Sequence, residues 1–101
     1  ITRGTPPGHF NAIYITDPSE CIENNEDEYN RAAVKKAADQ DAFIFWNHPG
    51  WKPNIEGSYD WIPFVDDLHK NNALHGIEVI NGFGFHMKAL DWCVDKGLTR
   101  L

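Results

Sequence analysis

Histidine is the residue type in this chain best suited to holding a metal ion, and one histidine lies where binding groups usually gather. The apolar run 42–46 leads directly into Asn47, His48 and Pro49, so His48 is expected at the carboxyl end of a buried strand. Ligand-binding groups of α/β proteins collect in the loops after such strand ends. His48 is therefore the leading candidate for a metal ligand, a role that needs an imidazole fixed in one tautomer. The alternative is a loop histidine that donates to a nearby carbonyl group.

A carboxylate inside a second apolar run is the next unusual feature. Glu78 lies within the run 76–80, and Asn81 follows it. Burying a carboxylate is costly unless it is paired or coordinated. Glu78 is therefore expected to have a partner, either a lysine or arginine, or a metal-bound histidine that it supports from behind. Asn81 either contacts a ligand or begins the glycine-rich turn 81–85.

The other four histidines are placed less clearly. His9 begins the first predicted strand instead of ending it, and from this position alone a structural or exposed role is expected. His86 opens the last predicted helix, where it either reaches a site or only starts the helix. His69 is expected on a helix surface, and His75 comes just before a strand.

Composition excludes several classes of protein. The chain has 101 residues, 42% of them hydrophobic, which suits one folded domain and excludes a disordered tail. Its net charge is −6 and no basic stripe stands out, so binding of nucleic acid by general electrostatics is not favoured. No apolar run approaches the roughly 18 residues of a membrane span, and the first residues do not resemble a signal peptide. We expect a soluble protein, with the cytoplasm slightly favoured.

Common catalytic motifs are missing as well. The sequence has no GxSxG elbow, no phosphate-binding loop and no HExxH. Nucleophilic serine or cysteine catalysis therefore has no support. Cys21 and Cys93 do not form a disulfide framework, and Cys93 is expected to be a small buried apolar residue.

Hydrophobic periodicity predicts strands and helices in alternation. The predicted order is strand 9–16, a helix from about 26, strand 42–46, a helix from about 59 to 70, strand 76–80, helix 86–96 and a further strand from 98. The acidic stretch 20–28 is expected to be a solvated loop. Consecutive βα units imply an α/β fold with a parallel sheet and right-handed crossovers. Whether that sheet is open or closed does not follow from these units.

Three segments together resemble one known family. They are GHFNAIYI, FIFWNHPGW and HGIEVINGFGFHMKALDWCVDKGLT, and they resemble the later half of the PHP family, named for polymerase and histidinol phosphatase. In that family a Gly-His segment, a His-Pro dipeptide after a strand and a Gly-Ile-Glu-Val-x-Asn strand occur in this order. The resemblance runs from about Gly8 to Leu98, and the stretch 20–28 matches least.

The resemblance implies a metal-dependent phosphoesterase. His9 and His48 correspond to two of the family's metal-ligand histidines, and Glu78 and Asn81 would line the site, to which we add His86 from its position. The family fold is a distorted seven-stranded β/α barrel that holds two or three divalent ions, commonly Zn, Mn or Fe. The implied reaction is metal-assisted hydrolysis of a small phosphorylated substrate, with nucleic acid not favoured. No catalytic residue and no oligomeric state is assigned.

Other motifs of the family lie outside the sequence, among them an opening His-x-His and a later Asp-x-His. We therefore expect residues 1–101 to be a partial domain, cut at both ends. Two alternatives stay open. The first is a non-catalytic α/β module whose exposed aromatic residues, Trp51 and 83–85, bind a partner. The second is a metal-dependent hydrolase that acts on another kind of bond.

Overall fold

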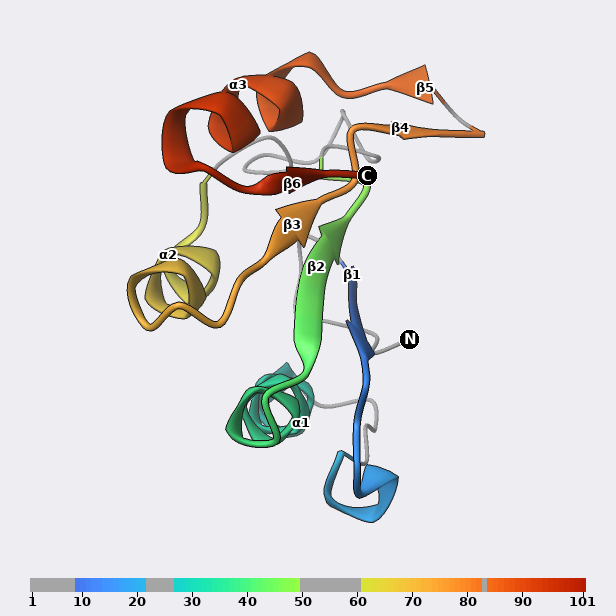
Figure 1. Cartoon of the computed structure of the whole chain (residues 1–101), viewed down its shortest axis with the longest axis vertical. Coiled ribbons are helices and arrows are strands. Elements are labelled where there is room, and N and C mark those ends of the chain that lie inside the picture. Colours follow the sequence, from blue (N-terminus) through green and yellow to red (C-terminus); the bar gives the residue numbers. More distant parts are fainter. Residues whose placement is uncertain (1–8, 22–26, 50–60, 83) are drawn as a thin grey trace.

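The computed structural model describes residues 9–21, 27–49, 61–82 and 84–101. The elements alternate along the chain as predicted (Figure 1). They are β1 (His9–Ile13), the short 3-10 helix η1 (Pro18–Glu20), α1 (Asp27–Asp39), β2 (Phe43–Asn47), α2 (Pro63–Lys70), β3 (Gly76–Ile77), β4 (Ile80–Asn81), β5 (Gly84–Phe85), α3 (Met87–Lys96) and β6 (Thr99–Arg100). Most of the predicted acidic loop, at 22–26, and Trp51 and Phe83 of the predicted aromatic surface lie outside the described residues.

The main sheet has the strand order β1-β2-β3-β6, and its last three strands are parallel. The expectation of a wholly parallel sheet is wrong for β1, which pairs antiparallel with β2 from His9↔Asn47 to Ile13↔Phe43. Contacts at the other end of these two strands agree with this direction. Gln40, just before β2, accepts hydrogen bonds from the backbone N–H groups of Thr16 and Asp17, just after β1, at 3.0 and 2.7 Å. The end of β1 and the start of β2 are therefore held together, as an antiparallel pair requires.

Two predicted strands are shorter in the structure. The strand expected over 9–16 ends at Ile13, because Tyr14 has a φ of 65° and turns the chain away from the sheet. The strand expected over 76–80 divides into β3 and β4. Beyond β3, the backbone N–H groups of Val79 and Ile80 both donate to the carbonyl of Leu101, and β4 then pairs with β5 in a separate two-stranded sheet. The predicted glycine-rich loop therefore forms a hairpin.

The helix ends follow the sequence signals. Pro63 lies in the first turn of α2, where a missing N–H group breaks no helical hydrogen bond. Gly97 ends α3 with a φ of 68°, a left-handed conformation that favours glycine. Gly76 is needed for a different reason, because a Cβ atom there would lie 2.9 Å from the carbonyl oxygen of Thr99 on β6.

The core lies between the sheet and the three helices. Trp46 on β2 is fully buried; its ring stacks on Trp92 of α3 and meets Trp61 edge to face, with centroids 5.5 and 6.3 Å away. Phe10 of β1 stacks on the same indole at 6.5 Å. Because Trp46 lies one residue before the end of β2, this cluster fixes the strand end that carries His48.

Cys93 is buried in α3, as predicted, and burial raises the pKa of its thiol. It is a free cysteine. Among the described residues, no helix is long and apolar enough to cross a bilayer.

Candidate functional site

His9 and His48 lie side by side at one edge of the sheet. The antiparallel pairing places His9 opposite Asn47, one residue before His48. Nδ1 of His9 lies 3.0 Å from Nε2 of His48, and the two rings meet edge to face with centroids 5.0 Å apart. Both imidazoles are partly exposed, so neither is sealed inside the core. Two residues that are 39 positions apart in the chain therefore meet at one site.

Glu78 contacts the other side of the His48 ring. Its Oε2 lies 3.3 Å from Nδ1 of His48. Among the described residues, the ion pair of Glu78 is with His48. Of the two kinds of partner expected for Glu78, a basic lysine or arginine or a histidine, the structure therefore shows the histidine. The tautomer that satisfies both ring contacts carries its proton on Nδ1 of His48 and leaves a lone pair on Nε2, facing His9. A carboxylate that orients an imidazole from behind is a common arrangement behind metal-ligating histidines.

The backbone of His48 is strained. Its φ is 30°, a value that costs a residue with a side chain on the order of 1 kcal/mol or more, and a following proline normally favours extended backbone instead. The N–H group of His48 donates to the same Glu78 Oε2 at 2.6 Å. Glu78 therefore holds both the ring and the backbone of His48, and the strain is typical of functional sites.

Asn81 supports the carboxylate in turn. Its Nδ2 donates to Glu78 Oε2 at 3.3 Å. Asn81 thus lies next to the site through Glu78, as expected for a residue that lines it.

Burial lowers the pKa of His48 below its ordinary value. Nearby His9 and His86 lower it further, whereas the negative charge of Glu78 acts in the opposite direction. The net effect favours the neutral imidazole at neutral pH, which is the form that binds a cation.

The three remaining histidines differ in their surroundings. His86 is buried, and its Nε2 has no hydrogen-bond partner in the described part of the chain. His69, predicted on a helix surface, is half-buried with its ring against Trp61 at 5.9 Å. His75 accepts a hydrogen bond at Nδ1 from the backbone N–H of Ile44, at 3.0 Å. His69 and His75 thus have structural contacts, whereas His86 has an unused polar atom.

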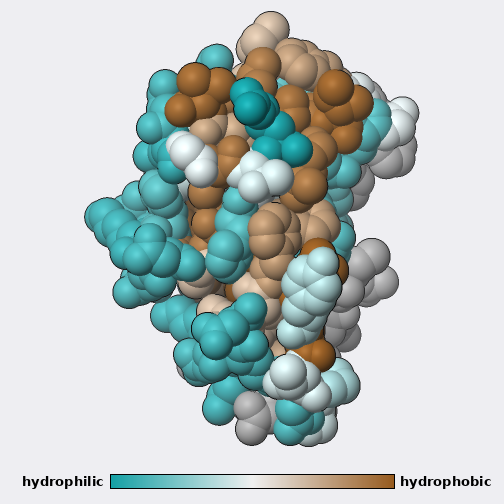
Figure 2. All heavy atoms as spheres, viewed as in Figure 1, coloured by the Kyte–Doolittle hydropathy of each residue, from teal (hydrophilic) through white to brown (hydrophobic). Residues whose placement is uncertain are grey.

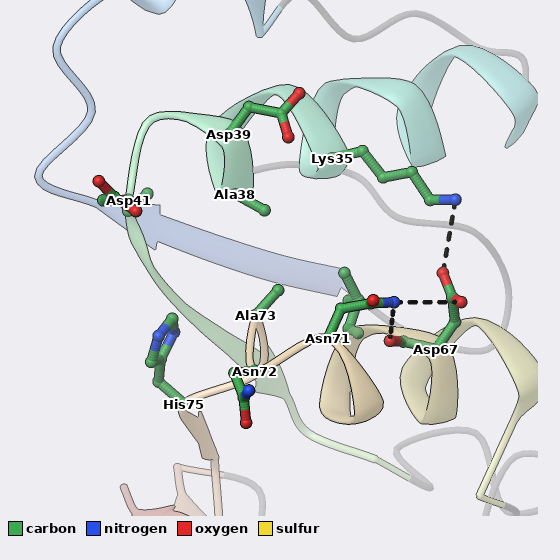
Figure 3. Close-up of a pocket in the computed structure, with 11 residues that line it drawn as sticks. Lys35, Ala38, Asp39, Asp41, Asp67, Asn71, Asn72, Ala73 and His75 are labelled. Atoms are coloured by element: carbon green, nitrogen blue, oxygen red, sulfur yellow. Dashed lines mark hydrogen bonds and ion pairs between the residues drawn. The ribbon is translucent and has the colours of Figure 1, made fainter.

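A cavity of about 530 Å³ lies at the opposite edge of the sheet (Figure 3). Its polar lining comes mainly from the chain just before β2 and β3 and from the ends of α1 and α2: Lys35, Asp39, Asp41, Asp67, Asn71, Asn72 and His75. Lys35 reaches Asp67 across it at 3.4 Å. Sequence reasoning missed this cavity, since these residues form no motif. The cavity lies at the amino ends of the parallel strands, where α/β proteins seldom bind ligands. For this reason we favour the site formed by His9 and His48 as the functional site.

The described residues do not complete a metal centre. Within 9–21, 27–49, 61–82 and 84–101, no group of three or more histidine, cysteine, aspartate or glutamate side chains is placed to hold an ion. The pair His9 and His48 could supply two nitrogen ligands. Structural and catalytic Zn²⁺ sites commonly use three or four protein ligands, so further donors would have to come from outside these residues.

Comparison with known proteins gives one strong likeness. No family model and no curated protein matches the sequence. A solved structure does match, that of a two-domain protein from Bacteroides vulgatus ATCC 8482 described as containing a predicted PHP-like metal-dependent phosphoesterase. The chain is similar to part of that protein. Identity is 40% over 99% of this chain, the TM-score is 0.79, and the chain spans 28% of the length of the Bacteroides protein.

Proposed function

We propose that this chain forms part of a metal-dependent hydrolase of phosphoesters, in which His9 and His48 hold a divalent cation. The observation that carries the proposal is the His9–His48–Glu78 arrangement. One nitrogen of His48 lies 3.0 Å from Nδ1 of His9, and its other nitrogen faces the carboxylate of Glu78. The likeness to the Bacteroides protein supports the same reaction class.

The geometry of the two imidazoles fits a shared cation. Two nitrogens bound to one tetrahedral Zn²⁺ at about 2.0–2.1 Å lie roughly 3.3 Å apart. The 3.0 Å between His9 Nδ1 and His48 Nε2 is close to this value, so a shared cation would require the rings to separate slightly and to turn until both lone pairs point toward it. His48 already has its lone pair on the required side, whereas His9 would have to move its ring proton from Nδ1 to Nε2. Zn, Mn or Fe are the candidate metals, with two or three ions in a complete domain.

The protein groups have distinct roles in this proposal. A bound divalent cation would lower the pKa of a water molecule and neutralise charge on phosphoryl oxygens. His48 and His9 bind rather than transfer protons. Glu78 fixes the tautomer and orientation of His48, and Asn81 steadies Glu78.

The complete domain would be larger than the described sheet. We propose that β1, β2, β3 and β6 belong to a distorted β/α barrel and that residues 1–101 are a partial domain. The substrate would be a small phosphorylated molecule, because a chain of net charge −6 is poorly suited to a long nucleic acid.

The test uses the full-length protein and measures bound metal and hydrolysis together. We expect a divalent metal in the purified protein, release of phosphate from p-nitrophenyl phosphate, loss of that activity in EDTA and its return when Zn²⁺ or Mn²⁺ is added. A folded protein that takes up neither metal and hydrolyses nothing would refute the proposal. That outcome would favour a non-catalytic binding module.

Glu78→Gln tests the support behind His48. Removing the charge of the carboxylate should weaken metal binding about 10–100-fold, the usual effect of changing a group behind a metal-bound histidine, while the chain stays folded. Metal affinity measured by competition with a chelator gives the readout. Asp67→Asn is the matched control, since that carboxylate lies on α2 and pairs with Lys35. Equal affinity in both variants would remove Glu78 from the site.

A further inference from the structure

His86 carries a buried polar atom with no use in the described structure. The residue is only 7% exposed, and its Nε2 is one of three buried side-chain atoms, with Asn11 Oδ1 and Trp46 Nε1, that have no hydrogen-bond partner among the described residues. Leaving such an atom unpaired costs about 1–3 kcal/mol. Native proteins keep few of these groups, and each one calls for an explanation such as an absent ligand or water.

The hairpin β4–β5 places His86 on the same face as Asn81, which lies beside the site of His48 and Glu78. Ile80 pairs with Phe85 and Asn81 with Gly84, and the N–H of His86 donates to the carbonyl of Val79 at 2.7 Å. Opposed residues of an antiparallel pair share a face, and successive residues alternate. Val79, Asn81 and His86 therefore share one face of the hairpin.

The two faces of the hairpin differ in character. On the inner face, Asn81 reaches Glu78, which in turn holds His48. On the outer face, Ile80 and Phe85 are 65% and 50% exposed. Apolar surface gathers at this end of the molecule in Figure 2, where Figure 1 places α3 and the hairpin. His86 thus turns with Asn81 toward the histidine site, which agrees with its electrostatic effect on His48.

His86 also stands at the amino end of α3. It is the N-cap residue of this ten-residue helix, and its side chain makes no capping hydrogen bond. The amino end of a helix carries a partial positive charge and favours anions. An imidazole donor beside such an end is suited to an oxyanion, and His86 joins no group of described residues placed to hold a metal ion.

We propose that Nε2 of His86 donates a hydrogen bond to a phosphoryl oxygen of the ligand bound beside His48. This inference rests on the proposed function and names the residue that recognises the oxyanion. Because His86 is 7% exposed, this contact requires the hairpin β4–β5 to shift away from the covered atom. That hairpin has only two residue pairs, and a two-stranded hairpin is marginally stable by itself.

The experiment titrates inorganic phosphate into the full-length, metal-loaded protein and its variants. His86→Ala should raise the dissociation constant for phosphate about tenfold or more, the usual effect of losing one hydrogen bond to a charged group. His86→Gln should stay within about threefold of wild type, because its amide nitrogen supplies a donor at a similar place. His69→Gln is the matched control and should change nothing. The metal content of each variant is measured alongside.

Each result decides the inference. Unchanged phosphate affinity in His86→Ala overturns it, and so does a parallel loss of metal, which would make His86 part of the metal site or of the fold. If neither variant folds, the imidazole resonances of His86 in the wild type decide, since they must shift when phosphate is added. A wild type that binds no metal and hydrolyses nothing refutes the proposed function instead. Active wild type with an unaffected His86→Ala refutes only the role of His86.

Discussion

His48→Ala is expected to reduce the affinity for divalent metal by at least about 100-fold and to abolish phosphoester hydrolysis with it. The substitution removes the imidazole that faces His9 through Nε2, and it also leaves the Glu78 carboxylate without its partner at Nδ1. Changing a residue that only hydrogen-bonds to a metal ligand already lowers metal affinity about 10–100-fold. Loss of the ligand itself should therefore lower the affinity by about 100-fold or more. Bound metal measured by elemental analysis, with activity on p-nitrophenyl phosphate, gives the readout.

The control for this variant is another half-buried histidine. His69→Ala removes an imidazole of α2 that packs against Trp61 and should leave metal content and activity near those of the wild type. His48→Ala itself should fold, because His48 is partly exposed and its removal leaves no large gap in the core. Alanine is strained at this backbone conformation about as much as histidine, so the substitution adds little backbone strain. Wild-type metal content in a folded His48→Ala protein would contradict the assignment.

Trp46→Ala is expected to lower the free energy of unfolding by about 3–5 kcal/mol, the usual cost of truncating a buried large aromatic side chain. The indole is fully buried and contacts rings from β1, α3 and the segment before α2, so no single neighbour can fill the space. Urea unfolding followed by circular dichroism, in EDTA so that metal binding does not contribute, measures the change.

A second variant separates packing from hydrogen bonding. Nε1 of Trp46 has no partner in the described part of the chain. Trp46→Phe keeps a ring and removes that orphaned N–H, so it should cost roughly half as much as the alanine variant or less. A loss below about 1 kcal/mol in Trp46→Ala, the average for point mutations, would show that this cluster does not hold the core together.

Element type followed from local pattern for most of the described chain. The helix α1 has alanines at helical spacing, Pro63 marks the first turn of α2, and Gly97 ends α3 where predicted. Strand lengths were less accurate. The end of β1 depends on the turn at Tyr14, and the end of β3 depends on the hydrogen bonds of Val79 and Ile80 to Leu101. Neither feature is visible in a local sequence window.

The site shows the same division. His48 and Asn81 were candidates because each follows an apolar run, and Glu78 was a candidate because its carboxylate lies inside one. His9 was the least favoured of the proposed ligands by that rule, since it starts its strand. The rule assumed that all strands run the same way, and the antiparallel direction of β1 places the start of that strand beside the end of β2.

The sequence by itself determined which residues have suitable chemistry and which segments form helices or strands, because propensity, spacing and turn residues act within a few positions of the chain. Only the tertiary structure decided the direction of β1, the 3.0 Å approach of His9 to His48 and the choice of His48 as the partner of Glu78. These features depend on contacts between residues 23 to 39 positions apart, such as those of Gln40 with Asp17 and of His9 with His48. Such contacts form only when the whole sheet and its core have packed.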